Sequence, residues 1–497
     1  MNQNNISATE LFQRVRELLT LPDLEPKTRN KMMHDTLILC CHEGVKDTKQ
    51  AFGNLFSQVD YLCKARGIKV ADKIAIQTMR RHSNSQEPLS GEDLKYDARA
   101  LTLFISAVFE ERIPHEVNVL IPHINRPFQK GLEINNRRIR CIVKNWDSDF
   151  IRVDIDQDAD EEEYLVRLKD EENHIDHTYL WDLLKEGMQL NLLDCQVKQP
   201  IITPRLIVVE PDYLVDISSI ATCFTAFGHH PLLYLLNLMK PRANTQATLL
   251  GNFAGAALDD IINSHGKYQV NETVKSNFRE KALEFCTCPW FDAKKFYTDA
   301  SLQAFNLQQV VDILFPRTAS QAKMSAFRGE SLYDRKKAIL EPSFVCEALG
   351  IQGRVDLMTT DCKLLVEQKS GRNMNIETHQ VDPAYHSYQL EPHYVQLLLY
   401  YGVLQHNFKL SNDRVNIRLL YSKYQPQDGL MVVAYYQKLF KEAIEYRNQL
   451  VAASFEIAKE GFEHTLNEFT PEVLNVAGTQ DFFYNKYLKP QIEAITN

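Results

Sequence analysis

Long apolar stretches are missing from this 497-residue chain: no run reaches the roughly 18 residues that a membrane-spanning helix needs. The first residues, MNQNNIS, lack the basic and apolar segments of a secretory leader, so an intracellular, cytoplasmic location of bacterial type is expected. The ten cysteines show no spacing typical of a disulfide framework, which fits a reducing compartment. No G-x-x-x-x-G-K-[S/T] segment is present, which excludes a P-loop ATPase.

An excess of basic residues is missing as well, since the formal net charge is −9. Net charge does not exclude a nucleic-acid ligand, because phosphate contact needs only a local basic stripe and a metal site needs acids. At 497 residues the chain is too long for one ordinary domain, so about two to four domains are expected.

The periodicity of apolar residues divides the chain into four regions. The first, 1–112, is expected to be helical, and Ser7-Ala-Thr-Glu10 has the pattern of a capping box. The second, 113–200, alternates apolar and polar residues like short strands, which indicates a small β-barrel-like (OB-like) domain. The third, 201–460, mixes apolar strands with long helices, and 461–497 is expected to be a helical extension. The predicted fold class is therefore α+β with several domains.

The segment from Gly353 to Arg372 has the pattern of a β-hairpin with apolar arms and a polar tip. The expected arms are 354–359 and 363–370, with the turn near Thr360 and Asp361. The long loop that follows, 370–392, is expected to be functional because loops of that length in compact domains often are.

Charged side chains share one face of this hairpin. With a two-residue turn, Asp356 lies opposite Leu365 and diagonal to Glu367, and Lys369 is on the same face as Glu367. Two carboxylates this close repel each other unless a cation lies between them, so the face predicts a site for a hard divalent ion. The alternative is an ordinary solvated face.

An apolar helix is expected to follow, from near Leu390 to Gln405. Its polar residues His393, Gln396 and Tyr400 are spaced i, i+3, i+7 and therefore share one face. A polar stripe on so apolar a helix indicates a nearby polar site. The alternative is a set of buried polar groups that satisfy one another.

Taken in order, these motifs resemble the PD-(D/E)XK nuclease superfamily, and within it the RecB-like branch. The resemblance covers roughly residues 205–460 and is closest to the nuclease part of the eukaryotic-type replication helicase–nuclease and to the CRISPR-associated RecB-like exonucleases. It implies a nuclease core with a mixed sheet flanked by helices. The branch pattern is G-x-x-D, then E-x-K, then Q-x-x-x-Y, and this sequence matches it with Gly353…Asp356, Glu367-Gln-Lys369 and Gln396…Tyr400. Members often carry a further Glu upstream, where this chain has Glu341, and several have a His three residues before the Gln, where this chain has His393.

The resemblance implies hydrolysis of DNA phosphodiester bonds with Mg²⁺, or Mn²⁺ in its place, as cofactor. The implied metal ligands are the carboxylates of Asp356, Glu367 and Glu341 and the backbone carbonyl of Gln368. The ion would polarise a phosphoryl oxygen and lower the pKa of a bound water.

Other residues receive roles from the same resemblance. Lys369 would orient or activate the water and offset charge on the phosphate, and Gln396 and Tyr400 would position Lys369 or the scissile strand. The implied DNA contacts are Arg372, His393 and Lys423.

The sequence departs from the resembled pattern at one ligand position. Relatives carry G-N-x-x-H, whose histidine binds metal, whereas this chain has Gly251-Asn-Phe-Ala-Gly255. Asp259, one turn later on the same face of the expected helix, is a hypothesised substitute. Many relatives also hold an iron–sulfur cluster through cysteines after the core, and since no cysteine follows Cys362, no cluster is expected.

The expected function is a metal-dependent DNA nuclease acting on single strands, ends or flaps in replication or repair. DNA is the expected ligand, a helicase domain or subunit is the expected partner, and no membrane is involved. The alternative is a weak or inactive nuclease fold that binds DNA or scaffolds a repair complex, which Gly255 favours. A restriction-type endonuclease ranks last, because no recognition helix is evident.

Overall fold

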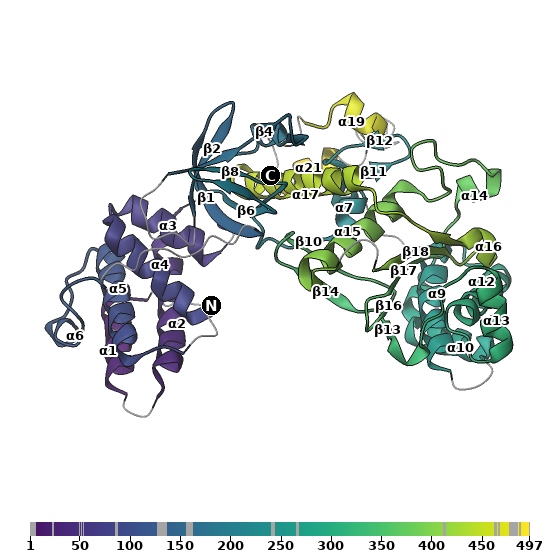
Figure 1. Cartoon of the computed structure of the whole chain (residues 1–497), viewed down its shortest axis with the longest axis horizontal. Helices are drawn as coiled ribbons and strands as arrows, with labels where there is room; N and C mark the ends of the chain where they lie inside the picture. Colours follow the sequence, from purple (N-terminus) through teal and green to yellow (C-terminus); the bar gives the residue numbers. More distant parts are fainter. Residues whose placement is uncertain are drawn as a thin grey trace. The chain divides into compact units, whose positions relative to one another are not determined.

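The structure is a computed structural model of the 497-residue chain, and it describes most of that chain. The described residues are 6–21, 24–48, 50, 52, 54–84, 88–126, 137–155, 163–239, 244–264, 268–410, 414–461, 465, 468–476, 486 and 489–496. The chain divides into two compact units, Met1–Tyr213 and Leu214–Asn497, and each is described by itself (Figure 1). None of the helices in these described ranges is both long enough and apolar enough to cross a membrane.

The first unit begins with helices that share one apolar core, so the expected helical N-terminal region is confirmed (Figure 1). The predicted capping box is present: Ser7 Oγ accepts from Glu10 N, and the Glu10 carboxylate accepts from Ser7 N at 2.8 Å. The helices are α1 (Ala8–Thr20), α2 (Pro26–Val45), α3 (Leu55–Ala65), α4 (Val70–Asn84), α5 (Gly91–Phe109) and α6 (His115–Asn118).

A seven-stranded sheet completes this unit, in the order β7-β8-β3-β2-β1-β6-β9. Among the described residues β7 and β9 are its two edges, so the sheet is not closed and the expected small barrel is wrong. Alternation correctly predicted strands, but it carries no information on which strands become edges. The elements are β1 (Arg138–Trp146), β2 (Phe150–Ile155), β3 (Tyr164–Arg167), β4 (Lys169–Asp170), β5 (Ile175–Asp176), η1 (Thr178–Leu180), β6 (Gln189–Leu193), β7 (Gln196–Lys198), β8 (Ile201–Thr203) and β9 (Leu206–Val209).

Charged residues join the helices of the first unit to its sheet. Lys73 Nζ on α4 lies 2.6 Å from Asp60 Oδ1 on α3 and 3.3 Å from Asp154 Oδ2 on β2. Strand β9, placed by its sequence in the third region, pairs with β6 of this sheet through all four of its buried residues. Helices and sheet therefore belong to one compact body that ends at Tyr213.

The second unit contains a five-stranded mixed sheet in the order β13-β16-β17-β18-β19, in which β17 and β18 are parallel. A three-stranded sheet, β10-β15-β14, and the hairpin β11-β12 lie in the same unit. Its strands are β10 (Val215–Asp216), β11 (Phe224–Thr225), β12 (Gly228–His229), β13 (Ala338–Leu340), β14 (Ser343–Cys346), β15 (Ile351–Arg354), β16 (Leu357–Thr359), β17 (Leu364–Lys369), β18 (Asn416–Tyr421) and β19 (Leu430–Val432).

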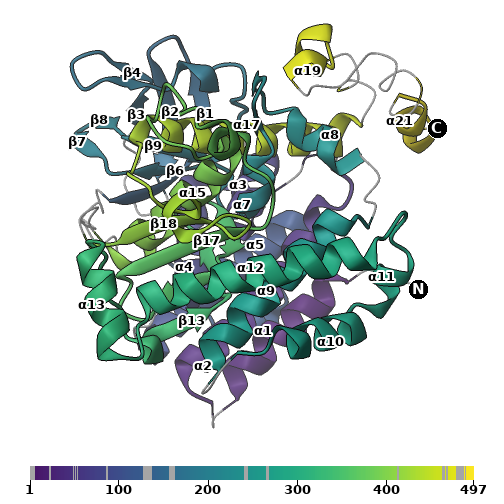
Figure 2. The same cartoon turned by 90° about the vertical axis from the view of Figure 1, so that its right-hand side faces the viewer.

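Helices flank the five-stranded sheet. Leu364 and Val366 of β17 and Leu420 of β18 join the apolar core of α9 and α12, which run side by side in Figure 2. The helical elements are α7 (Ile217–Ala221), α8 (Leu233–Met239), α9 (Gln246–Asn263), α10 (Val270–Glu280), α11 (Ala282–Cys286), α12 (Ala293–Leu314), α13 (Ala319–Phe327), η2 (Arg335–Lys337), α14 (Met374–Thr378), α15 (Glu391–Phe408), α16 (Pro426–Gly429), α17 (Gln437–Glu460), α19 (Pro471–Val476) and α21 (Lys489–Thr496).

Helix α15 connects the parallel strands β17 and β18 and contacts both of them. Since side chains alternate along β17, the residues that do not face α12 face α15. The whole chain is thus a mixed α/β protein of two compact units, in which one strand of the second unit directs side chains to helices on both sides.

Candidate active site

The register of the predicted hairpin differs from the expected one. Leu357 pairs with Val366 and Met358 with Leu365, so continuing the ladder brings Asp356 opposite Glu367 rather than opposite Leu365. The expected two-residue turn is wrong, because residues 360–363 lie between the strands and Thr359 Oγ1 accepts from the N–H of both Lys363 and Leu364. The two carboxylates are therefore directly across from each other.

Asp356 lies in the short interruption between the end of β15 and the start of β16. Its Oδ2 accepts a 2.6 Å hydrogen bond from the N–H of Gln368. Because Ser422 N donates to Lys369 O across the parallel pair, Gln368 directs its own N–H and C=O to the other edge of β17, toward Asp356. The Gln368 carbonyl is thus directed to the same edge of β17 as Asp356.

Lys369 connects the second and third sequence motifs. Its Nζ lies 2.7 Å from Glu367 Oε1 and 2.6 Å from Gln396 Oε1 on α15. Glu367 is only 5% exposed, and its other oxygen, Oε2, has no hydrogen-bond partner among the described residues. A buried carboxylate oxygen without a partner is unfavourable, so this atom calls for a cation or a proton.

The electrostatics of the pair are those of two acids that share a partly desolvated space. Burial raises the pKa of Glu367, and the neighbouring Asp356 raises it further. Burial likewise raises the pKa of Asp356, against the lowering effect of the Gln368 N–H. Since the two cannot both ionise at low energetic cost, a divalent cation between them would restore both charges.

Two further carboxylates contribute to the same negative field. Glu341 donates its backbone N–H to Asp356 O at 3.0 Å, and its carboxylate lies 3.2 Å from Arg354 Nη1. Burial raises the pKa of Asp259 on α9 to about 6, with Glu341 and Asp356 as the next causes. Asp259 therefore lies close enough to the acids of the hairpin to be affected by their charge.

Tyr400 fixes α15 against the end of β15. Its hydroxyl donates to Arg354 O at 2.6 Å, two residues before Asp356. A Cβ added at Gly353 would lie 2.9 Å from Tyr400 Cε1, a separation that side chains do not tolerate. The glycine of the G-x-x-D motif is therefore required by the close approach of this tyrosine.

One face of α9 runs past the site through residues spaced four apart. A Cβ at Gly251 would lie 3.2 Å from Ser370 Oγ, one residue after Lys369, and Asp259 experiences the charge of Asp356. Between them, a Cβ at Gly255 would meet no atom within 4 Å. Gly255, at the position where the resembled motif has a histidine, thus leaves open space beside α9.

His393 is partly buried beside Lys369, and its Nδ1 lies 3.0 Å from the Tyr421 hydroxyl. Burial lowers the pKa of His393 to about 3, and the charge of Lys369 lowers it further. A DNA contact by His393 would therefore be a neutral hydrogen bond and not a cationic one.

The two cationic residues expected to contact DNA both pair with a carboxylate that sequence reasoning missed. Arg372 Nε and Lys423 Nζ contact the Glu377 side chain, at 3.4 Å for the lysine. Glu377 lies in the long loop after β17, whose length was the only sequence signal for it.

Buried polar side chains hold β17 against α12 behind the site. Gln368 Nε2 donates to Ser422 Oγ at 2.7 Å, and Ser422 Oγ donates to Gln303 Oε1 at 2.6 Å. Gln303 Nε2 also donates to Ser370 O. This network fixes the backbone on both sides of Lys369, and none of its side chains stood out in the sequence.

The donor set fits a hard divalent cation. Within the described ranges, no group of three or more His, Cys, Asp or Glu side chains has the geometry of a metal site. The residues do supply oxygen atoms of the kind that Mg²⁺ prefers, from Asp356, Glu367 and the Gln368 carbonyl, and Glu367 Oε2 is buried without a partner.

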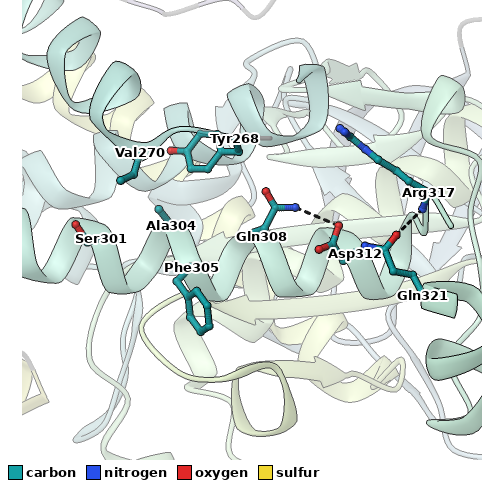
Figure 3. Close-up of a pocket in the computed structure, with 9 residues that line it drawn as sticks. All are labelled: Tyr268, Val270, Ser301, Ala304, Phe305, Gln308, Asp312, Arg317 and Gln321. Atoms are coloured by element: carbon teal, nitrogen blue, oxygen red, sulfur yellow. Dashed lines mark hydrogen bonds between the residues drawn. The ribbon is translucent and has the colours of Figure 1, made fainter. Parts of the chain in front are cut away.

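A separate pocket of about 550 Å³ opens on α12 (Figure 3). Its walls include Ser301, Gln308 and Asp312, which lie on a different face of α12 from Gln303. In Figure 3 Gln308 is hydrogen-bonded to Asp312, and Arg317 to Gln321. The pocket therefore does not belong to the cluster around Lys369.

Comparison with known proteins gives no assignment: no family model matches the chain, and no curated protein matches its sequence.

Proposed function

We propose that this protein is a metal-dependent nuclease that hydrolyses DNA phosphodiester bonds, of the RecB-like PD-(D/E)XK kind. The proposal is carried by one observation: Lys369 lies between Glu367 and Gln396, and Asp356 lies across from Glu367. Residues from three separate motifs thus converge on one point. An ordinary solvated face would not bury Glu367 or leave one of its oxygens without a partner.

Asp356, Glu367 and the Gln368 carbonyl would hold Mg²⁺ or Mn²⁺, with Glu341 as a further carboxylate. The bound ion supplies Lewis acidity and a water of lowered pKa. Lys369 keeps its ammonium near the position of the scissile phosphate and offsets the negative charge that develops there. Gln396 Oε1 accepts a hydrogen bond from Lys369 Nζ and so fixes the direction of the ammonium.

Asp259 is the proposed replacement for the histidine of the resembled motif. It faces the site from α9, and its pKa is raised first by burial and then by the charges of Glu341 and Asp356. Asp259→Asn should weaken both Mn²⁺ binding and cleavage, and unchanged values for both would remove Asp259 from the ligand set.

Cleavage of labelled single-stranded, 5′-flapped and 3′-flapped DNA tests the proposed function. We expect wild-type cleavage that requires Mg²⁺ or Mn²⁺ and stops with chelator. Asp356→Asn and Lys369→Ala should lower the rate by about 10²-fold or more while leaving DNA binding near the wild-type level. Calorimetric Mn²⁺ titration gives a second readout, in which only Asp356→Asn should lose affinity.

Asp361→Asn is the matched control, because this carboxylate lies in the loop of the same hairpin and pairs with Lys337 outside the cluster. It should cleave DNA like the wild type. Normal cleavage by Lys369→Ala, or equal losses in Asp361→Asn and Asp356→Asn, would show that the roles are wrongly assigned.

The open space at Gly255 favours a second candidate, a nuclease fold that binds DNA or scaffolds a repair complex with little or no catalysis. The same assay separates the two: binding of DNA and Mn²⁺ without cleavage under any metal condition would support the scaffold. For either function the proposed partners are DNA and a helicase domain or subunit.

A further inference from the structure

The loops that follow β17 and β18 bring two cations onto one carboxylate. β17 and β18 are parallel and end in register, with Lys369 paired to Tyr421. Arg372 lies three residues beyond Lys369 and Lys423 two residues beyond Tyr421, so each is within roughly 10 Å of chain length from the end of its own strand.

Glu377 on α14 is the acceptor for both cations. Its Oε2 accepts from Arg372 Nε, and its Oε1 lies 3.4 Å from Lys423 Nζ and accepts from the Tyr424 hydroxyl at 2.8 Å. These contacts lower the pKa of Glu377, with Arg372 as the first cause, so its charge is maintained at neutral pH.

A hydrogen bond also joins the two loops: Asn373 N donates to the Tyr424 hydroxyl at 2.8 Å. Within the loop after β17, the buried Asn373 side chain donates to Tyr388 O at 2.8 Å. Lys423 Nζ lies 5.9 Å from the centre of the Tyr424 ring. The tyrosine ring beside Lys423 and the backbone next to Arg372 are thus both fixed by hydrogen bonds.

The cations nevertheless remain accessible. The side chains of Arg372 and Lys423 are 62% and 41% exposed. Among the contacts of the described residues, Glu377 engages Arg372 through Nε, which leaves Nη1 and Nη2 to donate to a second anion. One carboxylate against two cations leaves a net charge of +1, which complements one phosphodiester group.

We propose that Glu377 is a positioning residue that holds Arg372 and Lys423 as a binding subsite for a phosphate of the DNA strand, next to the one that is cleaved. The position of this subsite next to the cleaved phosphate rests on the proposed nuclease function, whereas the subsite itself requires only DNA binding. Glu377 orients the cations and does not contact the DNA.

Binding of fluorescein-labelled single-stranded DNA to the full chain, measured by anisotropy with chelator across a salt series, tests this subsite. Arg372→Ala and Lys423→Ala should each reduce the magnitude of the log K against log[salt] slope by about 0.7. Glu377→Ala should weaken binding about 3- to 10-fold although it removes a negative charge. Glu377→Gln should bind nearly as the wild type, because its carboxamide oxygen can still accept from Arg372 Nε, while its NH2 group donates to the Tyr424 hydroxyl, which can donate to Asn373 O instead.

The matched control is Glu272→Ala, which makes the same charge change at an exposed glutamate that pairs with Lys275 on α10. It should leave binding unchanged or slightly tighter. In cleavage assays Glu377→Ala should raise KM with little change in kcat, a split that a general loss of folding would not produce.

Tighter binding by Glu377→Ala would overturn the proposal, because Glu377 would then be competing with phosphate. Unchanged binding would overturn it as well, since the cations would not depend on Glu377. Failure of the nuclease function looks different: wild-type DNA binding with the expected salt slopes but no metal-dependent cleavage would leave the subsite in place and remove only its relation to a cleaved phosphate.

Discussion

At the scale of single residues, Gly255 is the position where this chain differs most usefully from the pattern it resembles. A Cβ there meets no atom within 4 Å, and Gly255 lies on the α9 face between Gly251, beside Ser370, and Asp259. We predict that Gly255→His folds normally and adds an imidazole to an oxygen ligand set. Imidazole favours transition metals over Mg²⁺, so Mn²⁺ affinity should rise about tenfold, or about 1.4 kcal/mol, and Mg²⁺ affinity should change less.

Isothermal calorimetry with each ion measures this change, and Gly255→Ala is the control. Alanine fills none of the site, so it should leave metal binding alone and stabilise the mid-helix position by about 0.5–1 kcal/mol. Equal affinities of Gly255→His and Gly255→Ala for Mn²⁺ would mean that this face of α9 does not reach the metal site.

The site residues show what the sequence alone could predict. The spacings of Asp356, Glu367 and Lys369 indicated one face, and in the structure the Glu367–Lys369–Gln396 contacts bring two of the motifs together. Glu377 was not predictable, because nothing in a loop sequence indicates which side chain folds back onto Arg372 and Lys423. Its partners are set by the ends of β17 and β18, which are neighbours only in the folded sheet.

At the scale of elements, His229 links the β11–β12 hairpin to two helices. Its Nε2 lies 2.6 Å from Glu391 Oε2 at the start of α15, and its Nδ1 lies 2.7 Å from Glu442 Oε1 on α17. Hydrogen bonds to Glu391 and then to Glu442 raise the pKa of His229 to about 9. Both ring nitrogens therefore donate, and the imidazole is charged at neutral pH.

The sign of the resulting pH dependence follows from a folded-state pKa above the ordinary value of about 6.5. The stabilisation is complete below about pH 6.5 and is lost as the pH rises through about 9. Hydrogen exchange in β11–β12 and the first turn of α15 should therefore lose protection between pH 6.5 and 9. Since the side chain is partly exposed, we expect a loss of about 1 kcal/mol, or about fivefold in protection.

His229→Gln should remove this pH dependence, because a carboxamide carries no charge and cannot donate to both glutamates. His230→Gln is the comparison: the pKa of His230 is lowered by burial and its Nδ1 accepts from Leu232 N, so the pH dependence should remain. Retention of the dependence in His229→Gln would assign it to groups other than His229.

Element prediction succeeded where the signal was local and failed where it was not. The Ser7–Glu10 capping box needs only four consecutive residues and is present as predicted. The register of the hairpin depends on the length of the loop 360–363 and on the interruption between β15 and β16. There the Tyr400 hydroxyl donates to Arg354 O and Glu341 N donates to Asp356 O, both from other parts of the chain. A two-residue turn is therefore wrong for a reason that no local sequence pattern contains.

At the scale of the whole molecule, each of the two compact units has hydrophobic clusters of its own. The apolar clusters of the helices and of the seven-stranded sheet lie entirely before Tyr213, and those of α9–α12 and of α8 lie entirely after it. The periodicity of apolar residues predicted a domain boundary near residue 200. Periodicity detects where strand-like alternation ends, but it does not detect which strands pair with each other across that point. Strands β8 and β9, after residue 200, are paired with β3 and β6 before it.

We predict that residues 1–213 and 214–497, expressed separately, each unfold cooperatively, and that 214–497 binds Mn²⁺ with the affinity of the full chain because all of its proposed ligands lie there.

The matched control divides the chain at 200/201. Residues 1–200 then lack β8 and β9 and expose the edges of β3 and β6, while 201–497 carries four buried apolar residues of β9 without their partner strand. Exposed edges and apolar strands promote aggregation, so both pieces of the control should be less soluble and melt at lower temperature. Thermal unfolding and light scattering of the four fragments measure this, and a fragment 1–200 as stable as 1–213 would mean that β9 contributes little to the sheet and that the boundary lies where periodicity placed it.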